Sequence, residues 1–261
     1  MDCCCQDKEE PFNFRVAIPT YKRHKTLGDK TLKTLDNHNI PKNIIDIFVK
    51  NQEEYELYKP LYSEYNIIVG EVGMKEIREF IFNYYNEGDK IFCIDDDIIA
   101  FKKKNDNLLD NVSNLRETID TGFNLCEENK TCLFGIYPVE NAFFMKDNYT
   151  THLSFCVGWC FGVIIDKEVL KLNVAQYEDY ERTIKVFKKY GKVIRMNNIC
   201  ASTKYSKKDS GGMNDDNRVN IMKRDLEIIM TLYGDYINVV KKKSSLIGCN
   251  PQIKRNIKNI I

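Results

Sequence analysis

Apolar and polar positions alternate along the first part of the chain in a way that predicts strands followed by helices. Short apolar runs at 13–20, 44–49 and 66–69 are expected to be strands, because each is rich in β-branched residues and bounded by polar or turn-forming residues. Apolar residues at helical spacing follow at 53–62 and 75–86. Strands that alternate with helices in this way are typical of right-handed βαβ units around a parallel sheet.

The fourth apolar run leads into three consecutive aspartates. Residues 90–101, KIFCIDDDIIAF, are expected to form a buried strand from whose carboxyl end Asp95, Asp96 and Asp97 emerge. If strand geometry persists, Asp95 and Asp97 point to one side of it. Neighbouring carboxylates repel one another unless a cation or hydrogen-bond donors lie among them. Two carboxylates on one side suit Mg²⁺ or Mn²⁺, and a helix N-terminus or an acidic turn is the structural alternative.

The rest of the chain predicts a second region that is dominated by strands. Helices are expected at 112–128, 177–190 and 219–233, and strand-like apolar segments at 131–137, 142–145, 153–165 and 192–201. The close spacing of the strand-like segments predicts a mixed or antiparallel sheet that covers the first half. We detect no linker and no internal repeat, so the chain is interpreted as a disordered tail, 1–12, and one domain, 13–261.

Composition and charge narrow the class of protein. The chain has 261 residues, 43% of them hydrophobic and 30% charged, which is ordinary for a soluble globular protein. A formal net charge of +1 provides no global field that would attract nucleic acid or a membrane. The longest apolar stretch, 153–165, is too short to span a bilayer, so we expect an intracellular protein that is not secreted. Its ten cysteines show no paired CxxC pattern of a zinc site.

Further polar segments fit one chemistry together with the aspartates. A basic and aromatic loop, 21–25, follows the first predicted strand, Glu178 and Asp179 begin a predicted helix, and 206–218 has the composition of a mobile loop. Sugar transfer from a nucleotide donor needs a positive charge beside the leaving diphosphate, to stabilise its negative charge. It needs a carboxylate that accepts the proton of the acceptor hydroxyl. It also needs a loop that closes over the diphosphate. These segments therefore indicate a nucleotide-sugar transferase.

The same segments form an ordered series that resembles a known family. The series is IPTYKR (18–23), IDDDI (94–98), FGIYPVENAFFM (134–145), CVGWCFGVIID (156–166), EDYERT (178–183) and KVIRMNN…TKY…GGM…R (192–218). It resembles GT-A glycosyltransferases, and within them it is most similar to the TET/JBP-associated glycosyltransferases of viruses, phages and kinetoplastids. The similarity extends from residue 14 to about residue 233. A DxD motif alone has low specificity, whereas the ordered series is much more specific.

The resemblance implies a fold and a reaction. The implied fold is α/β of the Rossmann-like GT-A type, a mixed and mainly parallel sheet flanked by helices, with a smaller antiparallel region on the acceptor side. Residues 13–100 are implied to bind the nucleotide sugar, and 101–261 to form the acceptor half with a mobile loop and C-terminal helices. The implied reaction is an inverting transfer of a hexose from a UDP-glucose-like donor, with Mn²⁺ or Mg²⁺ as cofactor. A viral protein of this kind would act in the host cytoplasm or nucleus.

The acceptor that the resemblance implies is a hydroxyl group on DNA. The family is proposed to glucosylate hydroxylated pyrimidines, so a hydroxymethylated pyrimidine in DNA is the expected acceptor. The near-neutral net charge disfavours strong binding to duplex DNA, because phosphate contacts require local positive charge. A glycan or a protein is the alternative acceptor.

The resemblance also implies roles for single residues. Donor binding is implied for Pro19, Thr20, Tyr21, Arg23, Arg78, Asp95, Asp96, Gly211, Gly212 and Arg218. Metal binding is implied for Asp95 and Asp97. The catalytic base is implied to lie in the pair Glu178 and Asp179, of which we favour Asp179, and helix N-terminal acids that offset a dipole are the alternative. Trp159 is implied to be an acceptor platform, although a single tryptophan on an apolar strand is as often a core residue.

Alternative interpretations remain open for several residues and for the whole chain. Asp96 would either contact a ribose or cap a helix. Gly211 and Gly212 would form only a turn, and Arg78 would pair with a surface acid. Haloacid-dehalogenase phosphatases also carry DxD after an apolar strand and use magnesium, but normally on their first strand. A third possibility is an inactive nucleotide-sugar-binding or interaction module, against which the intact acidic residues argue.

Overall fold

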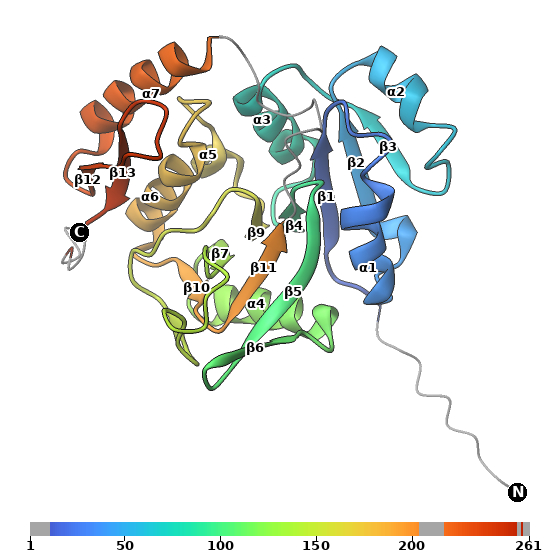
Figure 1. Cartoon of the computed structure of the whole chain (residues 1–261), viewed down its shortest axis with the longest axis horizontal. Helices are drawn as coiled ribbons and strands as arrows, with labels where there is room; N and C mark the ends of the chain where they lie inside the picture. Colours follow the sequence, from blue (N-terminus) through green and yellow to red (C-terminus); the bar gives the residue numbers. More distant parts are fainter. Residues whose placement is uncertain (1–10, 204–216, 255–256, 258–261) are drawn as a thin grey trace, which may run out of the picture.

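A single eight-stranded sheet forms the centre of the protein (Figure 1). The structure is a computed structural model that describes residues 11–203, 217–254 and 257. In the large sheet the strands follow the order β3-β2-β1-β4-β9-β7-β10-β8. Two smaller antiparallel sheets, β11-β5-β6 and β12-β13, accompany it. The α/β class and the mixed, mainly parallel sheet flanked by helices are therefore confirmed.

The first four strands of the chain are parallel to one another, as the alternation of strands and helices predicts. They are β1 (Arg15–Thr20), β2 (Ile45–Val49), β3 (Asn66–Val69) and β4 (Lys90–Ile94). Val16 and Ile18 of β1 pack in one hydrophobic core, whereas Ala17 between them packs in a second core on the opposite face. Because both faces are covered, these strands read as continuous apolar runs. Their carboxyl ends lie at one edge of the sheet.

Helices cover both faces of the large sheet (Figure 1). On one face lie the π-helix η1 (Gly28–Leu32), α1 (Lys33–Asn37), α2 (Gln52–Tyr58) and α4 (Leu115–Glu128), and on the other α3 (Met74–Tyr84), α5 (Lys167–Leu170), α6 (Glu178–Tyr190) and α7 (Arg218–Tyr233). A short 3-10 helix, η2 (Lys42–Ile44), precedes β2. Asn51 and Asn114 cap α2 and α4, because each side chain accepts a backbone N–H of the first turn.

The second half of the chain extends the large sheet, so the prediction that it covers the first half is wrong. The added strands are β7 (Leu133–Ile136), β8 (Tyr149–Thr150), β9 (Cys160–Ile164) and β10 (Ile194–Met196). The reason is that β9 pairs antiparallel with β4 and with β7, which carries the sheet beyond β4. The apolar segment 142–145 forms a turn and not a strand.

Two predicted strands break where polar residues occur. The run 90–101 is divided by a turn at the aspartates into β4 and β5 (Ile98–Asn105). The run 192–201 is divided into β10 and β11 (Ile199–Thr203). With β6 (Leu108–Asn111), β5 and β11 form the first small antiparallel sheet. After α7, the strands β12 (Ile237–Lys241) and β13 (Cys249–Ile253) form a hairpin in a stretch where the apolar pattern predicts no element.

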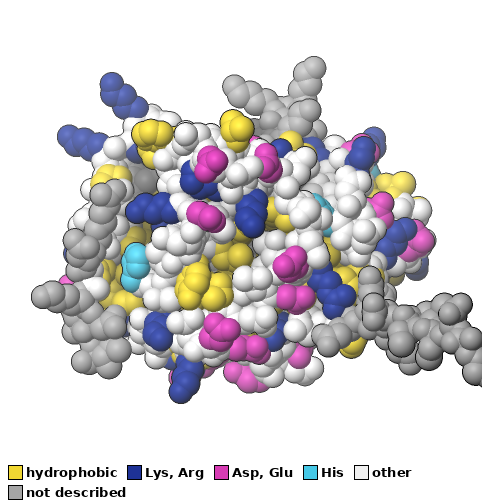
Figure 2. Space-filling view, turned by 90° about the horizontal axis from the view of Figure 1, so that it is seen from below, with side chains coloured by type: hydrophobic (Ala, Val, Ile, Leu, Met, Phe, Trp, Pro, Cys, Tyr) yellow, Lys and Arg dark blue, Asp and Glu magenta, His cyan; other side chains and the backbone are white. Residues whose placement is uncertain are grey.

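The surface of the described residues carries charges of both signs. On the face in Figure 2, which is Figure 1 seen from below, Lys and Arg side chains are interspersed with Asp and Glu side chains. This mixture agrees with the formal net charge of +1. Within the part of the chain that the structure describes, no helix combines the length and the apolar character that a bilayer crossing requires.

Candidate active site

The carboxyl ends of β1 and β4 bring the predicted donor loop against the three aspartates. The two strands pair in parallel, so the segments that follow them leave the sheet at the same edge. Thr20, the last residue of β1, donates a hydrogen bond from Oγ1 to Asp96 Oδ2 at 2.6 Å. The Thr20 hydroxyl also lies 2.8 Å from the hydroxyl of Tyr58 in α2. Residues separated by 76 positions in the sequence are thus directly linked.

Asp96 is the most deeply placed of the three aspartates. Only 5% of it is exposed, and its second oxygen accepts a hydrogen bond from Arg23 Nη1. The same Arg23 nitrogen lies 3.4 Å from Asp97 Oδ2. Burial raises the pKa of Asp96 to about 6, although the Arg23 charge opposes this shift. Asp96 does not cap a helix; it holds Thr20 and Arg23 in place.

A threonine from η1 fixes the turn that carries the aspartates. Thr31 Oγ1 donates to the carbonyl oxygen of Asp95 at 2.8 Å and accepts the N–H of Ile98 at 3.0 Å. The turn leaves 34% of the Asp95 side chain and 15% of the Asp97 side chain exposed. Burial, and then the Asp95 charge, raises the pKa of Asp97, so the two carboxylates are close enough to repel each other.

This pair of carboxylates has the chemistry of a divalent-cation site. Hard oxygen ligands that repel one another in the metal-free protein are stabilised by a cation such as Mg²⁺ or Mn²⁺. Among the described residues, no three His, Cys, Asp or Glu side chains are arranged to hold a metal ion. A cation held by Asp95 and Asp97 would also bind water and substrate oxygens, which is the usual behaviour of Mg²⁺.

Arg78 of α3 connects the aspartates to the opposite side of the site. Its Nη2 donates to Asp95 Oδ1 at 2.8 Å and to the carbonyl oxygen of Gly158 at 2.9 Å. Its Nε lies 3.7 Å from Glu178 Oε1. Arg78 is only 2% exposed, so the alternative that it pairs with a surface acid is wrong. The side chain is buried because it lies between acids from two other segments, Asp95 after β4 and Glu178 of α6.

Glu178 and Asp179 at the start of α6 have different environments. Glu178 is 6% exposed and accepts a hydrogen bond from Arg182 Nη1, one turn along the helix. Asp179 accepts the N–H of Gly158 at 3.3 Å and that of Tyr180 at 2.9 Å. Enclosure by the protein and the charge of Glu178 raise the pKa of Asp179 well above its usual range. A carboxylate with a raised pKa holds a proton more readily near neutral pH than an ordinary aspartate does.

Two buried carboxylates fix the segment that leads into α6. Glu181 of α6 and Asp225 of α7, both 0% exposed, accept four backbone N–H groups from 173–176 at 2.7 to 3.1 Å. Tyr177 then adopts a left-handed conformation, with φ at 64°, immediately before the helix. The start of α6, and with it Glu178 and Asp179, is therefore rigidly placed.

Gly158 permits the close approach of α6 to the sheet. A Cβ atom on Gly158 would lie 2.6 Å from Glu178 Oε1 and 3.2 Å from Asp179 Cβ. The next residue, Trp159, is half-buried against the core, and its carbonyl oxygen accepts the N–H of Asp95 at 2.9 Å. The pair Gly158 and Trp159 thus lies between the aspartate turn and the start of α6.

The remaining predicted residues lie around this edge or outside the described residues. Pro19 is half-buried in β1, and the hydroxyl of Tyr21 accepts a hydrogen bond from Lys50 Nζ at 3.2 Å. Arg218 begins α7, and its charge acts on the hydroxyl of Tyr177, whose pKa is nevertheless raised to about 12 by burial. Gly211 and Gly212 lie outside the described residues.

Sequence reasoning missed several residues that build the site. Thr31 and Tyr58 carry no sequence signal, because their partners lie far away in the chain. Arg182 has one: it follows Glu178 by four residues, the spacing at which acidic and basic side chains meet on a helix. Gly158 was noticed only as part of the motif 156–166. A glycine is needed there because α6 approaches so closely that a Cβ atom would lie 2.6 Å from Glu178 Oε1.

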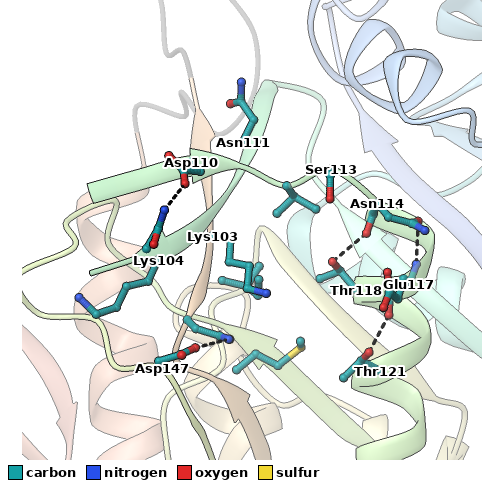
Figure 3. Close-up of a pocket in the computed structure, with 15 residues that line it drawn as sticks. Lys103, Lys104, Asp110, Asn111, Ser113, Asn114, Glu117, Thr118, Thr121 and Asp147 are labelled. Atoms are coloured by element: carbon teal, nitrogen blue, oxygen red, sulfur yellow. Dashed lines mark hydrogen bonds between the residues drawn. The ribbon is translucent and has the colours of Figure 1, made fainter. Parts of the chain in front are cut away.

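A cavity of about 540 Å³ lies away from these residues, between the β5–β6 hairpin and α4 (Figure 3). Its lining is polar, with Lys103, Lys104, Asp110 and Glu117 among the charged side chains. None of the residues predicted for the donor, the metal or the base lines it. The chemistry described above and this cavity are therefore separate features of the fold.

Comparisons with known proteins support the fold assignment at the level of structure. No protein-family model matches the chain, and no curated protein matches it in sequence. Among solved structures, S. aureus TarS matches with a TM-score of 0.51 and 14% identity, over 90% of this chain and 46% of that one, so the chain spans less than half of TarS. Glucosyl-3-phosphoglycerate synthase from Mycobacterium tuberculosis matches with a TM-score of 0.51 and 9% identity, over 93% of this chain and 87% of that one. Both are GT-A glycosyltransferases, and the chain therefore has the GT-A fold.

Proposed function

We propose that the protein is a metal-dependent glycosyltransferase that moves a hexose from a nucleotide sugar to a hydroxyl group. The observation that carries this proposal is the buried Arg78, which contacts Asp95 on one side and approaches Glu178 on the other. A pair of metal-suited carboxylates and a carboxyl with a raised pKa thus flank one site at the carboxyl edge of a parallel sheet, where such sheets bind ligands. The M. tuberculosis synthase, which shares the fold, was solved with Mn²⁺ and UDP-glucose.

Asp95 and Asp97 are the residues that would hold Mn²⁺ or Mg²⁺. Their mutual repulsion and partial exposure fit a cation that also binds a substrate. When bound, the cation would supply positive charge that stabilises a leaving diphosphate. Asp96 serves this site indirectly, because both of its oxygens are engaged by Thr20 and Arg23.

The donor is proposed to lie over the loop that follows β1, in contact with Pro19, Thr20, Tyr21 and Arg23. This loop is held by Asp96 and by the Tyr58 hydroxyl, which accepts the backbone N–H of Arg23 at 3.0 Å. Arg78, buried beneath Asp95, is proposed to position that carboxylate. For the diphosphate we retain the proposal of Gly211, Gly212 and Arg218.

Asp179 is proposed to accept the proton of the acceptor hydroxyl, which gives an inverting transfer. Its raised pKa makes proton transfer near neutral pH favourable, and its position beside Gly158 leads to Trp159 as the acceptor platform. Glu178, engaged by Arg182 and approached by Arg78, is proposed to hold the arginines that surround the base.

The experiment that tests the proposed function follows nucleoside diphosphate release. Purified protein with Mn²⁺ and a panel of UDP- and GDP-sugars should release the diphosphate, and Asp97→Asn should lower the rate at least about 100-fold. A magnesium-dependent phosphatase would instead release inorganic phosphate without any nucleotide sugar. The proposal is wrong if no UDP- or GDP-sugar binds at about 1 mM with metal present.

For the acceptor, we propose a hydroxymethylated pyrimidine in DNA, as in the TET/JBP-associated glycosyltransferases. The ordered motif series supports this assignment. The face in Figure 2 carries charges of both signs, which on that face favours a limited contact with DNA rather than an extended one. Incubation with hydroxymethylcytosine or hydroxymethyluracil DNA, and separately with glycans and proteins, would show the acceptor as a mass increase. Transfer to a glycan or a protein, and none to DNA, would remove the DNA acceptor and keep the enzyme.

A further inference from the structure

Among the residues that the structure describes, no acidic side chain pairs with the positive charge of Arg195 of β10. Its Nε donates to Asn197 Oδ1 at 2.8 Å. Among the described residues, neither Nη1 nor Nη2 has a hydrogen-bond or ion-pair partner, and neither is sealed from solvent. This differs from Arg78 and Arg182, which pair with Asp95 and Glu178. Arginine stays charged in proteins, so a half-buried guanidinium with two available nitrogens is a site for an anion.

The guanidinium of Arg195 is held in position before any ligand arrives. Its partner Asn197 is only 2% exposed, donates from Nδ2 to Asn148 Oδ1 at 2.8 Å, and donates its N–H to the Asn148 carbonyl oxygen at 2.9 Å. The Arg195 guanidinium carbon lies 5.4 Å from the centre of the Tyr137 ring. A fork that is fixed at Nε and supported by a ring presents its two other nitrogens together, which suits a two-point contact with phosphate oxygens.

Arg195 lies on the sheet face that α6 covers. It pairs in register with Gly135 of β7, which pairs with Phe161 of β9, so the three residues share one face of the sheet. Arg182 of α6 stacks on the Phe161 ring at 3.7 Å. The start of α6 carries the proposed base, Asp179, and Arg195 is therefore on the base side of the sheet.

Short contacts connect the surroundings of Arg195 to those of Asp179. Cys156 lies beside β10, with its Sγ 3.5 Å from the carbonyl oxygen of Ile194. The N–H of Cys156 donates to Thr183 Oγ1 at 3.3 Å, and that hydroxyl donates to the Asp179 carbonyl oxygen at 2.7 Å. One buried cysteine and one threonine thus connect the strand that carries Arg195 to the helix that carries the proposed base.

The groups around Arg195 favour a phosphate. Burial lowers the pKa of Arg195, and the groups that oppose this shift are Cys156 and Tyr137, with no carboxylate among them. His152 is exposed and close enough for Arg195 to contribute to the lowering of the His152 pKa, after burial. Two guanidinium nitrogens on which no carboxylate of the described residues acts can contact two oxygens of one tetrahedral anion, and a neighbouring imidazole can serve as a further donor.

We propose that Arg195 binds a phosphate group of the acceptor and thereby selects acceptors that carry one next to the reacting hydroxyl. The catalytic consequence rests on the proposed function, whereas phosphate binding at Arg195 does not. The phosphate belongs either to the backbone of a nucleic-acid strand or to a small phosphorylated acceptor. Both present the same chemistry to the guanidinium.

Phosphate binding is tested on the full chain without metal or donor. Inorganic phosphate, titrated at constant ionic strength, should raise the unfolding temperature of the wild type. Arg195→Gln should weaken this binding about 10-fold to 100-fold, and Arg195→Lys should retain part of it. Arg116→Gln should bind phosphate as the wild type does, because Arg116 also lies over a ring, Phe12, but pairs with Asp120. Circular dichroism spectra of the variants establish that they are folded.

The two sources of phosphate are separated by a labelled single-stranded oligonucleotide in fluorescence anisotropy. Binding that Arg195→Gln weakens assigns the site to a nucleic-acid strand, and phosphate binding without oligonucleotide binding assigns it to a small acceptor. An unchanged phosphate affinity in Arg195→Gln, or no phosphate-dependent shift in the wild type, would overturn the proposal. UDP binding with Mn²⁺ is measured in parallel, since its failure in every variant would refute the transferase and leave the phosphate site intact.

Discussion

Arg78 Nη2 lies 2.8 Å from Asp95 Oδ1, and this arginine is only 2% exposed. The carboxylate proposed to bind metal is therefore anchored from beneath by a buried cation that reaches the α6 side of the site as well. Because the Arg78 charge also offsets that of Asp95, the aspartate turn is held in place without a metal. The site is thus arranged before its ligands bind, as electrostatic catalysis requires.

Removing the Arg78 charge should destabilise the protein strongly. Arg78→Met leaves Asp95 and the carbonyl oxygen of Gly158 without their common donor, and breaking a buried pair costs about 3–5 kcal/mol. Urea unfolding measures the loss. The control is Lys42→Gln, which breaks the exposed Lys42–Glu64 pair and should leave the unfolding midpoint nearly unchanged. Equal midpoints for the two variants would show that Arg78 has no such structural role.

The sequence predicts the sheet well and the site less well. The strands follow from local sequence patterns, whereas the site depends on contacts between residues that are far apart in the sequence. The parallel strands are visible because both faces of the sheet are buried, and β3 has the bounds that its apolar run predicts. The aspartates were expected on a continuing strand, yet Thr31, at 64 positions from Asp95, folds them into a turn. The burial of Arg78 likewise depends on Asp95 and Gly158, which no local pattern connects to its helix.

Gly158→Ala should disturb the base without replacing a charged residue. The added Cβ would lie 2.6 Å from Glu178 Oε1, so α6 or the Glu178 side chain must move. Overpacking of this kind costs about 1–3 kcal/mol, and the displacement should also lower the transfer rate through Asp179. Differential scanning calorimetry and the diphosphate-release assay measure the two effects. A variant with wild-type stability and rate would contradict the close packing described here.

The activity should depend on pH through Asp179. A base acts in its deprotonated form, so kcat/KM should rise as pH increases through the raised pKa of Asp179, at a higher pH than an ordinary aspartate would give. Asp179→Asn should lower kcat about 100-fold to 10,000-fold and leave the KM for the donor nearly unchanged. If the Asp179→Asn enzyme keeps the rate and the pH limb of the wild type, another group is the base.

Stability without ligands should depend on pH through Asp96. Its folded-state pKa of about 6 lies above the value of about 3.9 for an unfolded aspartate, so its contribution is fully present below about pH 4 and is lost as pH rises through about 6. Asp96→Asn should flatten this part of the curve of unfolding temperature against pH.

Asp166 provides the control with the opposite sign. Hydrogen bonds and the Lys189 charge outweigh burial and lower the pKa of Asp166, so its contribution is present above the unfolded pKa and is lost as pH falls through the lower, folded value. Asp166→Asn should therefore leave the decline toward pH 6 in place. A decline that survives in Asp96→Asn would show that Asp96 does not cause it.

The most direct test of the account is UDP binding with and without Mn²⁺, read as a shift in unfolding temperature. The account predicts a UDP-dependent increase that requires Mn²⁺, worth about 2.7 kcal/mol when UDP is at 100 times its dissociation constant. Asp97→Asn should lose this increase, whereas Asp110→Asn, in the separate cavity, should keep it. Stabilisation by UDP that is independent of Mn²⁺, or that persists in Asp97→Asn, would contradict the assignment of Asp95 and Asp97 as the metal and diphosphate site.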